Sequence, residues 1–464
     1  MIKSADLLVL GAGPAGLTAA WQAARAGLRV VLLERAPAVG GLAASFPVAG
    51  VRVDHGSHRL HPSTPAGILA DLRGLLGNDL QRRVRNGRLR IAGQWVGFPL
   101  RPAELAGRLP PPLLGRVAWQ TLIGPLRRPR GDTYAEVLRA NLGPALYDEL
   151  YAPYARKLWG LDGEQIDGEQ ARRRVAADTP VKIARRMLRP GRDGSGRTFF
   201  YPRHGFGQLS EAVADAAAAA GAELRLGSEA TRVTVTGEAV TVTAADGWQG
   251  DAGHLFSTVP LPVLARICTP GPDPEVLAAA GALRFRAMVL VYLVHKGTRP
   301  WTRFDAHYLP DLATPVTRIS EPSNYRESAL DPPDRTVLCA ELPCETGDPI
   351  WTATDRELAG LVTEALARHG LPPVRGGEHQ VRRLPRVYPV YQRGYADQLR
   401  ELDGWAGRLP RVTTFGRLGL FAHDNTHHAM AMAYDAVAAL AGGEWDRQAW
   451  AAARARFASH VVED

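Results

Sequence analysis

Three glycines near the start of the chain have the spacing of a diphosphate-binding turn. Gly11, Gly13 and Gly16 follow an apolar run over 6–10 and precede a helix-forming run over 17–26. In this order the first glycine permits a tight turn, the second lets the backbone approach a pyrophosphate, and the third lets the helix pack on the sheet. The helix N-terminus would present free N–H groups and a partial positive charge. The sequence therefore predicts a dinucleotide site.

An acidic residue ends the next apolar run. Glu34 closes residues 30–34 and stands about 20 positions after Gly16, where a carboxylate binds ribose hydroxyls in dinucleotide folds. The alternative is a glycine-rich turn in an ordinary βαβ unit, which would have the same strand and helix but no need of an acid at this position. Residues 35–45 then carry the pair Gly40-Gly41, which resembles the extended motif of glutathione-reductase-type flavoproteins. That resemblance implies FAD, with the glycine pair at the diphosphate and ribityl chain.

The composition is that of a folded, globular protein. The chain has 464 residues, 45% apolar and 22% charged, enough for two or three domain-sized units. Its net charge of +9 comes almost wholly from arginine, which we read as genomic composition rather than as a nucleic-acid surface. Three cysteines without metal-like spacing indicate free thiols in a reducing compartment. With neither a signal peptide nor a membrane-spanning apolar stretch, we expect a cytoplasmic location.

One segment complicates that location. Residues 99–130 form an apolar, helix-like stretch bracketed by arginines. Such a segment can lie on a membrane surface and admit a lipophilic substrate, so peripheral membrane association stays open. We favour a helical lid packed on its own substrate domain.

The remaining pattern predicts an α/β protein with a Rossmann-like FAD-binding domain, interleaved with a substrate domain of mixed sheet plus a helical insertion. A strand is expected over 51–54, a hairpin over 88–99 and helices from about 103 to 190. Short β runs over 222–260 would complete the nucleotide-binding sheet. The FAD-binding domain is expected to be discontinuous, and the proposed boundaries are 1–100, 195–262 and 405–464 for that domain, 101–194 for the helical insertion, and 263–404 for the β-rich part of the substrate domain.

Motifs spread along the chain resemble one superfamily. The glycine motifs, residues 154–160, 201–209 and 388–391, and the 416–419 segment are similar to the superfamily of protoporphyrinogen oxidase, flavin amine oxidases and UDP-galactopyranose mutase. Members with a tethered flavin use a cysteine near the C-terminal motif, but the nearest one here is Cys344, so the FAD is expected to be non-covalent. Leu42 stands where amine oxidases carry arginine after the glycine pair.

The resemblance implies a set of cofactor contacts from both ends of the chain. It places the start of the last helix at the N1–C2=O edge of the flavin, where backbone N–H groups stabilise the reduced form. The expected cofactor-binding residues are Gly11, Gly13, Pro14, Ala15, Gly16, Glu34, Arg35, Gly40, Gly41, Leu42, Gly56, Ser57, His58, Val233, Gly416, Arg417, Asn425, Thr426, Ala429 and Met430.

Candidate catalytic residues follow from the same resemblance: His58, Arg59, His61, Tyr391 and Arg417. An imidazole such as that of His58, with an ordinary pKa of about 6.5, suits proton exchange with the flavin or substrate, although a packing role is an equal alternative. Arg417 would face either the diphosphate or an anionic substrate. Tyr388 and Tyr391 are expected to wall the cavity, with aromatic core packing as the alternative. We expect Lys157 and Trp159 to form a domain junction.

The terminal histidines raise the question of a metal. His423, His427 and His428 have helical spacing but neither a cysteine partner nor a recognisable acidic pattern, so we expect no metal and place them beside the flavin. Their individual roles stay open.

Two reactions fit these motifs. The favoured one is an oxidase, dehydrogenase or desaturase that removes hydride from an organic small molecule at flavin N5. The alternative is a redox-neutral sugar isomerase like UDP-galactopyranose mutase, in which reduced FAD attacks a sugar carbon. A flavin-binding protein of low activity is the third reading. The partner is a small molecule, either a sugar nucleotide or a lipophilic compound. Its identity, the electron acceptor and the oligomeric state stay open.

Overall fold

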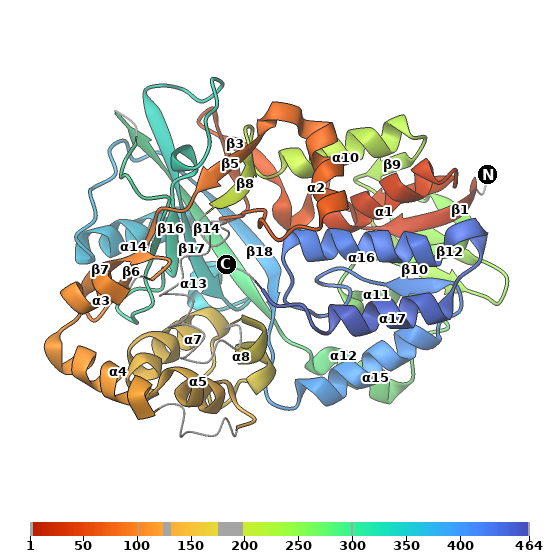
Figure 1. Ribbon diagram of the computed structural model, residues 1–464. Helices are drawn as coiled ribbons and strands as arrows, with labels where there is room; N and C mark the ends of the chain where they lie inside the picture. Colours follow the sequence, from red (N-terminus) through yellow and green to blue (C-terminus); the bar gives the residue numbers. More distant parts are fainter. Residues whose placement is uncertain (1–2, 101, 124–130, 175–197, 298–299, 463–464) are drawn as a thin grey trace.

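A mixed eight-stranded sheet carries the N-terminal glycine motif (Figure 1). The computed structural model describes residues 3–100, 102–123, 131–174, 198–297 and 300–462. The strand order is β13-β10-β11-β12-β1-β2-β9, with β19 added to β12. The strands are β1 (Lys3–Leu10), β2 (Val30–Glu34), β9 (Glu223–Leu226), β10 (Ala230–Val235), β11 (Val240–Ala244), β12 (Gln249–Ser257), β13 (Cys268–Thr269) and β19 (Val412–Thr414).

The centre of this sheet is parallel, because β1 pairs in parallel with both β2 and β12. Leu7, Leu8 and Val9 are fully buried, as expected for a central parallel strand covered on both faces. Helices α1 (Pro14–Arg25), α10 (Gln208–Ala219) and α16 (Thr426–Ala439) pack together on one face. Helix α1 begins earlier than the predicted residue 17, because Pro14 is well suited to a first helical position. The predicted β runs over 222–260 do join this sheet.

A seven-stranded sheet forms the other half, in the order β18-β14-β17-β16-β15-β6-β7. The predicted hairpin over 88–99 is confirmed as β6 and β7, and β6 pairs with β15, so residues within 1–100 belong to this second sheet. Its strands are β6 (Gly87–Ile91), β7 (Gln94–Phe98), β14 (Phe285–Lys296), β15 (Ala306–Tyr308), β16 (Arg318–Ser320), β17 (Arg335–Cys344) and β18 (His379–Pro389). The domain boundaries themselves stay a proposal.

The helices that follow β7 and precede β8 along the chain form the helical insertion, which lies at the lower left of Figure 1. Leu109 and Leu113 pack with the β6–β7 hairpin in one apolar cluster, and the lid stays a prediction. The predicted helices after residue 174 lie outside the described residues. The described elements are α3 (Pro102–Arg108), α4 (Pro111–Ile123), α5 (Tyr134–Leu142), α6 (Pro144–Leu146), the π-helical turn η4 (Tyr147–Tyr151), α7 (Ala152–Trp159) and α8 (Gly168–Arg174).

Short elements connect these parts. Two further antiparallel pairs are β3 (Ser45–Val48) with β4 (Val51–Asp54), and β5 (Leu80–Val84) with β8 (Thr198–Pro202). The remaining helices are α2 (Ala66–Leu76), α11 (Leu261–Ile267), α12 (Pro274–Ala282), α13 (Pro349–Thr352), α14 (Asp355–Arg368), α15 (Tyr395–Arg408) and α17 (Arg447–Phe457). Within the described ranges, every helix is too short or too polar to cross a bilayer.

Candidate functional site

The three N-terminal glycines are required for three different reasons. Gly11 has a φ of +101°, and a Cβ on it would lie 2.5 Å from Thr258 Oγ1. A Cβ on Gly16 would lie 1.9 Å from the carbonyl oxygen of Gly11, so only glycine lets α1 pack this closely. Gly13 differs, because a Cβ there would meet no atom within 4 Å. The missing side chain of Gly13 thus keeps space open in front of the backbone.

The other glycine motifs converge on this turn. Gly40 donates its N–H to Ala12 O at 2.7 Å. A Cβ on Gly41 would lie 3.4 Å from the Cα of Gly13, and one on Gly416 would lie 3.1 Å from the Cβ of Ala15. Both Gly41 and Gly416 have positive φ, at 54° and 81°. Glycines from both ends of the chain therefore lie around one turn, which we call the glycine cradle: Gly11, Gly13, Gly16, Gly40, Gly41 and Gly416.

Glu34 anchors the loops around the cradle. Its carboxylate accepts the N–H of Ala12 at 2.7 Å and the N–H of Ala36 at 2.8 Å. Each carboxylate oxygen has further lone pairs, so these bonds leave room for a ribose hydroxyl. Arg35 is exposed beside it.

These features fit a dinucleotide-type cofactor. Gly13 is the N-cap of α1 and supplies no side-chain hydrogen bond, so side chains do not cap the first turn of the helix. Free N–H groups at a helix start, next to space that a Cβ would fill, suit a phosphate group. The residues that would hold it are the ones found in the cradle.

The second helix end at the site is partly capped by its own side chains. Asn425 precedes α16 and forms a capping box with His428, whose Nδ1 accepts the Asn425 N–H at 3.2 Å. Thr426 starts the helix, and Ala429 and Met430 are buried within it. Val233 lies in β10 between β11 and β13, with its side chain in the core, and its predicted contact with the cofactor stays a prediction.

The predicted His58 loop is held by a buried ion pair. Glu341 accepts the Ser57 N–H at 3.0 Å and binds Arg318 through both carboxylate oxygens, at 2.7 and 2.9 Å. A Cβ on Gly56 would lie 3.2 Å from Glu341 Oε1. His58 stacks on Phe206 with centroids 5.2 Å apart, and burial lowers the pKa of His58 to about 4. His58 is therefore neutral near pH 7.

The other predicted catalytic residues have defined partners. Arg59 forms an ion pair with Asp305 at 3.2 Å and lies over Phe199. The ring of His61 contacts Ser63 Oγ at 2.7 Å. The hydroxyl of Tyr391 donates to Phe421 O at 3.2 Å, and its ring is buried. Their catalytic roles stay predictions.

Two guanidinium groups lie close to Tyr388, a residue of β18. The guanidinium groups of Arg417 and Arg174 lie 5.0 and 5.3 Å from its ring centroid. Among the described residues, neither arginine forms an ion pair with a carboxylate. Burial lowers the pKa of Arg417, and the charge of Arg174 acts in the same direction. Arg318 lies near enough for the charge of Tyr388 to affect its pKa.

The sequence did not predict three charged residues of this region, which are Arg174, Arg318 and Glu341. Arg174 ends a run of three arginines that reads as a solvated helix face, and Arg318 is a lone charge in a short strand. The only signal in the sequence was a charged residue at an inward position of an apolar strand, and this signal does not indicate which residue the charge pairs with.

Histidines and one aspartate gather where α16 begins. His460 Nδ1 contacts Asp424 Oδ1 at 3.0 Å, and His428 Nδ1 lies 3.5 Å from the same oxygen. Ligand atoms of these three residues lie within 4.8 Å of one another. His428 Nδ1 already serves the capping box, however. His423 packs against Trp159, with centroids 5.1 Å apart, and burial holds its pKa well below the ordinary value.

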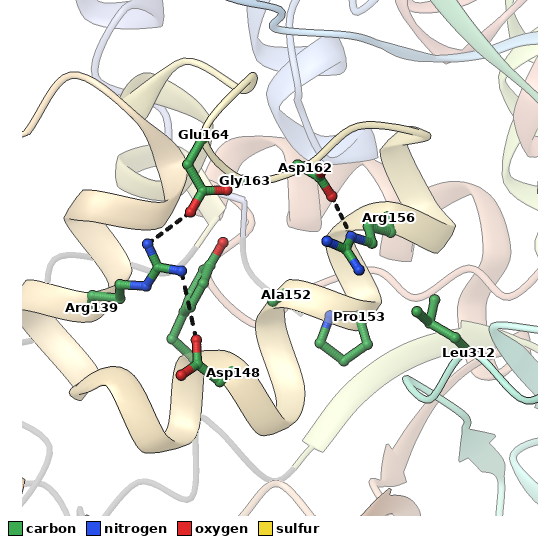
Figure 2. Close-up of a pocket in the computed structure, with 10 residues that line it drawn as sticks. Arg139, Asp148, Ala152, Pro153, Arg156, Asp162, Gly163, Glu164 and Leu312 are labelled. Atoms are coloured by element: carbon green, nitrogen blue, oxygen red, sulfur yellow. Dashed lines mark hydrogen bonds and ion pairs between the residues drawn. The ribbon is translucent and has the colours of Figure 1, made fainter.

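A separate hollow of about 350 Å³ lies on the helical insertion (Figure 2). Its charged side chains pair with one another: Arg139 binds Glu164 at 2.7 Å and Asp148 at 3.6 Å, and Arg156 binds Asp162. None of its lining residues belongs to the predicted site.

Comparison with known proteins places this arrangement in a family. Solved structures with the same fold include reduced UDP-galactopyranose mutase (TM-score 0.82, 21% identity, 99% of this chain and 100% of that one). A putative protoporphyrinogen oxidase from Exiguobacterium sp. 255-15 aligns with TM-score 0.75 and 19% identity over 95% of this chain and 99% of that one.

A curated relative, the putative flavin-containing monoamine oxidase AofH of Mycobacterium tuberculosis, is 30% identical over 281 residues. That match covers 55% of this chain and only 57% of the relative. The family model described as flavin containing amine oxidoreductase matches residues 14–436, so the chain belongs to the flavin-containing amine oxidoreductase family.

Proposed function

We propose that this flavin-dependent oxidoreductase binds FAD non-covalently in the glycine cradle and removes hydride from a small organic substrate that carries an anionic group. The observation that carries the anionic group is the pair Arg174 and Arg417 beside Tyr388. Both side chains are partly buried, and among the described residues neither forms an ion pair with a carboxylate. The charge of Asp424 does act on Arg417, whose Nη1 also contacts the Asp424 backbone oxygen at 3.5 Å.

Arginine suits this role because its planar guanidinium binds carboxylates and phosphates through two parallel hydrogen bonds. Arg318 adds a third cation, although Glu341 already neutralises it. Two cations that form no ion pair among the described residues match a diphosphate or two carboxylates. Tyr388 contributes a flat ring against which both guanidinium groups rest.

Bound FAD would supply the hydride acceptor. Residues of the chain hold the surrounding loops in place and provide a favourable electrostatic environment. Glu34 fixes the cradle, the N-terminus of α16 offers a positive dipole end, and the Glu341–Arg318 pair holds the loop that carries His58. His58 is neutral at pH 7 because burial lowers its pKa to about 4, which makes it a weak base for any proton that the substrate releases.

A redox-neutral isomerase of sugar nucleotides is the second candidate. The same two arginines favour it, because a sugar nucleotide presents a diphosphate. It differs in needing the flavin reduced before the substrate binds. A flavin-binding protein of low activity is what remains if neither reaction occurs.

Anaerobic mixing separates these functions. The oxidised holoprotein is combined with amines, amino acids, hydroxy acids and porphyrinogens, and the flavin absorption is followed. Bleaching by an anionic substrate supports the proposal, and bleaching only by uncharged or cationic substrates overturns its anionic part. Turnover of a sugar nucleotide by the dithionite-reduced protein, without net oxidation, would replace the proposal with the isomerase.

A further inference from the structure

Lys157 is almost fully buried and binds one loop through three backbone carbonyls. Its Nζ lies 2.5 Å from Leu309 O, 2.8 Å from Asp311 O and 2.6 Å from Val316 O. An ammonium has three N–H donors, so each carbonyl receives one. These acceptors all belong to the connection between β15 and β16, whereas Lys157 belongs to α7.

Both sides of this contact carry residues of the candidate site. The connection begins after Tyr308, the last residue of β15, and ends at Arg318, the first residue of β16. Helix α7 carries Trp159, whose ring lies 5.6 Å from that of Tyr388 and under the guanidinium of Arg174.

We propose that Lys157 is a positioning residue that clamps α7 to the β15–β16 connection and thereby sets the spacing between Arg318 on one side and the Trp159–Arg174–Tyr388 group on the other. The clamp acts on substrate binding through these residues. It rests on the anion-binding function proposed above.

Apolar side chains also meet where these two segments approach: Figure 2 shows Leu312 of the connection next to Pro153 of α7. Leu312 is 54% exposed, so apolar burial at this point is incomplete. The three hydrogen bonds of Lys157 add a polar contact between the two segments.

The charge of Lys157 decides how many carbonyls it can serve, because a neutral amine has only two N–H donors. Burial lowers the pKa of Lys157 to about 7, and the carboxylate of Asp311 opposes that shift. Asp311 is itself paired with His369 at 3.1 Å, and the pKa of Asp311 is lowered to about 2, so it stays ionised. Arg286 donates to Lys157 O at 3.4 Å and neighbours Glu345. The clamp is expected to loosen above pH 7.

The test compares Lys157→Met, which keeps the apolar stem, with Lys157→Arg, which keeps the charge at all pH values. Lys296→Met is the matched control, because Lys296 is exposed at the end of β14. The first readout is the affinity of the flavin-loaded protein for inorganic pyrophosphate, measured from pH 6 to 9. The second is hydrogen–deuterium exchange over residues 306–320.

We expect Lys157→Met to bind pyrophosphate about tenfold more weakly at pH 6, the equivalent of one hydrogen bond, with unchanged flavin content. Wild-type affinity should fall above pH 7, and Lys157→Arg should lack this fall. Unchanged affinity in Lys157→Met, or an equal loss in Lys296→Met, would overturn the proposal.

Hydrogen exchange keeps the two proposals separable. If wild-type protein binds no pyrophosphate, the anion-binding function fails. Faster exchange over 306–320 in Lys157→Met alone would then still support the clamp, whereas unchanged exchange would overturn it.

Discussion

Gly13 and Gly16 should respond oppositely to the same added methyl group. At Gly13 the backbone is extended, with φ −76° and ψ 176°, and a Cβ meets no atom within 4 Å. Alanine should therefore leave the cofactor-free fold as stable or raise its free energy of unfolding by about 0.4 to 1 kcal/mol, because the unfolded chain loses freedom. At Gly16 a Cβ would lie 1.9 Å from Gly11 O, and forcing that contact apart costs about 1 to 3 kcal/mol.

The affinity for the cofactor should respond in the opposite way, because the Gly13 substitution should weaken cofactor binding although it leaves the fold stable. A methyl on Gly13 would occupy the space in front of the turn, and a clash of about 1 to 3 kcal/mol weakens binding roughly tenfold to 100-fold. Valine should weaken it further. Chemical denaturation of the apoprotein and flavin titration of each variant measure the two effects separately. Stoichiometric flavin in Gly13→Val protein would refute the placement of the diphosphate, and a Gly16→Ala protein as stable as wild type would refute the packing argument.

Two further perturbations test the site and the buried histidines. Glu34→Ala removes the acceptor for the Ala12 and Ala36 N–H groups and should lower flavin retention more than Glu34→Gln, which keeps one acceptor oxygen; flavin content after gel filtration measures this, and equal retention in all three proteins would contradict it. Burial lowers the pKa of His254 to about 4, so between pH 6.5 and 4 the unfolded chain binds a proton that the folded one does not, and stability must fall as the pH falls. His254→Gln should remove about 3 kcal/mol of that loss, measured by denaturation at pH 7 and below pH 4, and an unchanged pH dependence would count against it.

The local elements could be predicted because their signals are local. The glycine turn, the apolar β1 and β2 runs and the alternating β6–β7 hairpin each carry their pattern within about a dozen residues. Hydrophobic periodicity and turn residues do not indicate, however, which distant strand will pair with a given strand. The pairing of β6 with β15 joins residues over 200 positions apart, and alternation alone allows β6 to join either sheet.

The site was predictable where it depends on backbone. Glycines that must approach one another leave a spacing signature, and Gly41 and Gly416 do lie at the cradle. Contacts between side chains leave no such spacing signature in the sequence. Tyr388 and Tyr391 are alike in sequence, yet Tyr388 meets the arginines whereas the Tyr391 hydroxyl binds Phe421 O. The different surroundings of the two tyrosines arise only when α8, β18 and the loop between β19 and α16 pack against one another.

The proposal that Arg174 and Arg417 bind an anion beside the flavin is tested most directly by the absorption difference spectrum of the flavin-loaded protein during titration with inorganic pyrophosphate. We expect a saturable perturbation of the flavin bands in the wild type, lost in Arg417→Met and Arg174→Met protein of full flavin content. A wild-type spectrum that does not change, or the same affinity in both variants, would contradict an anionic substrate held by these arginines.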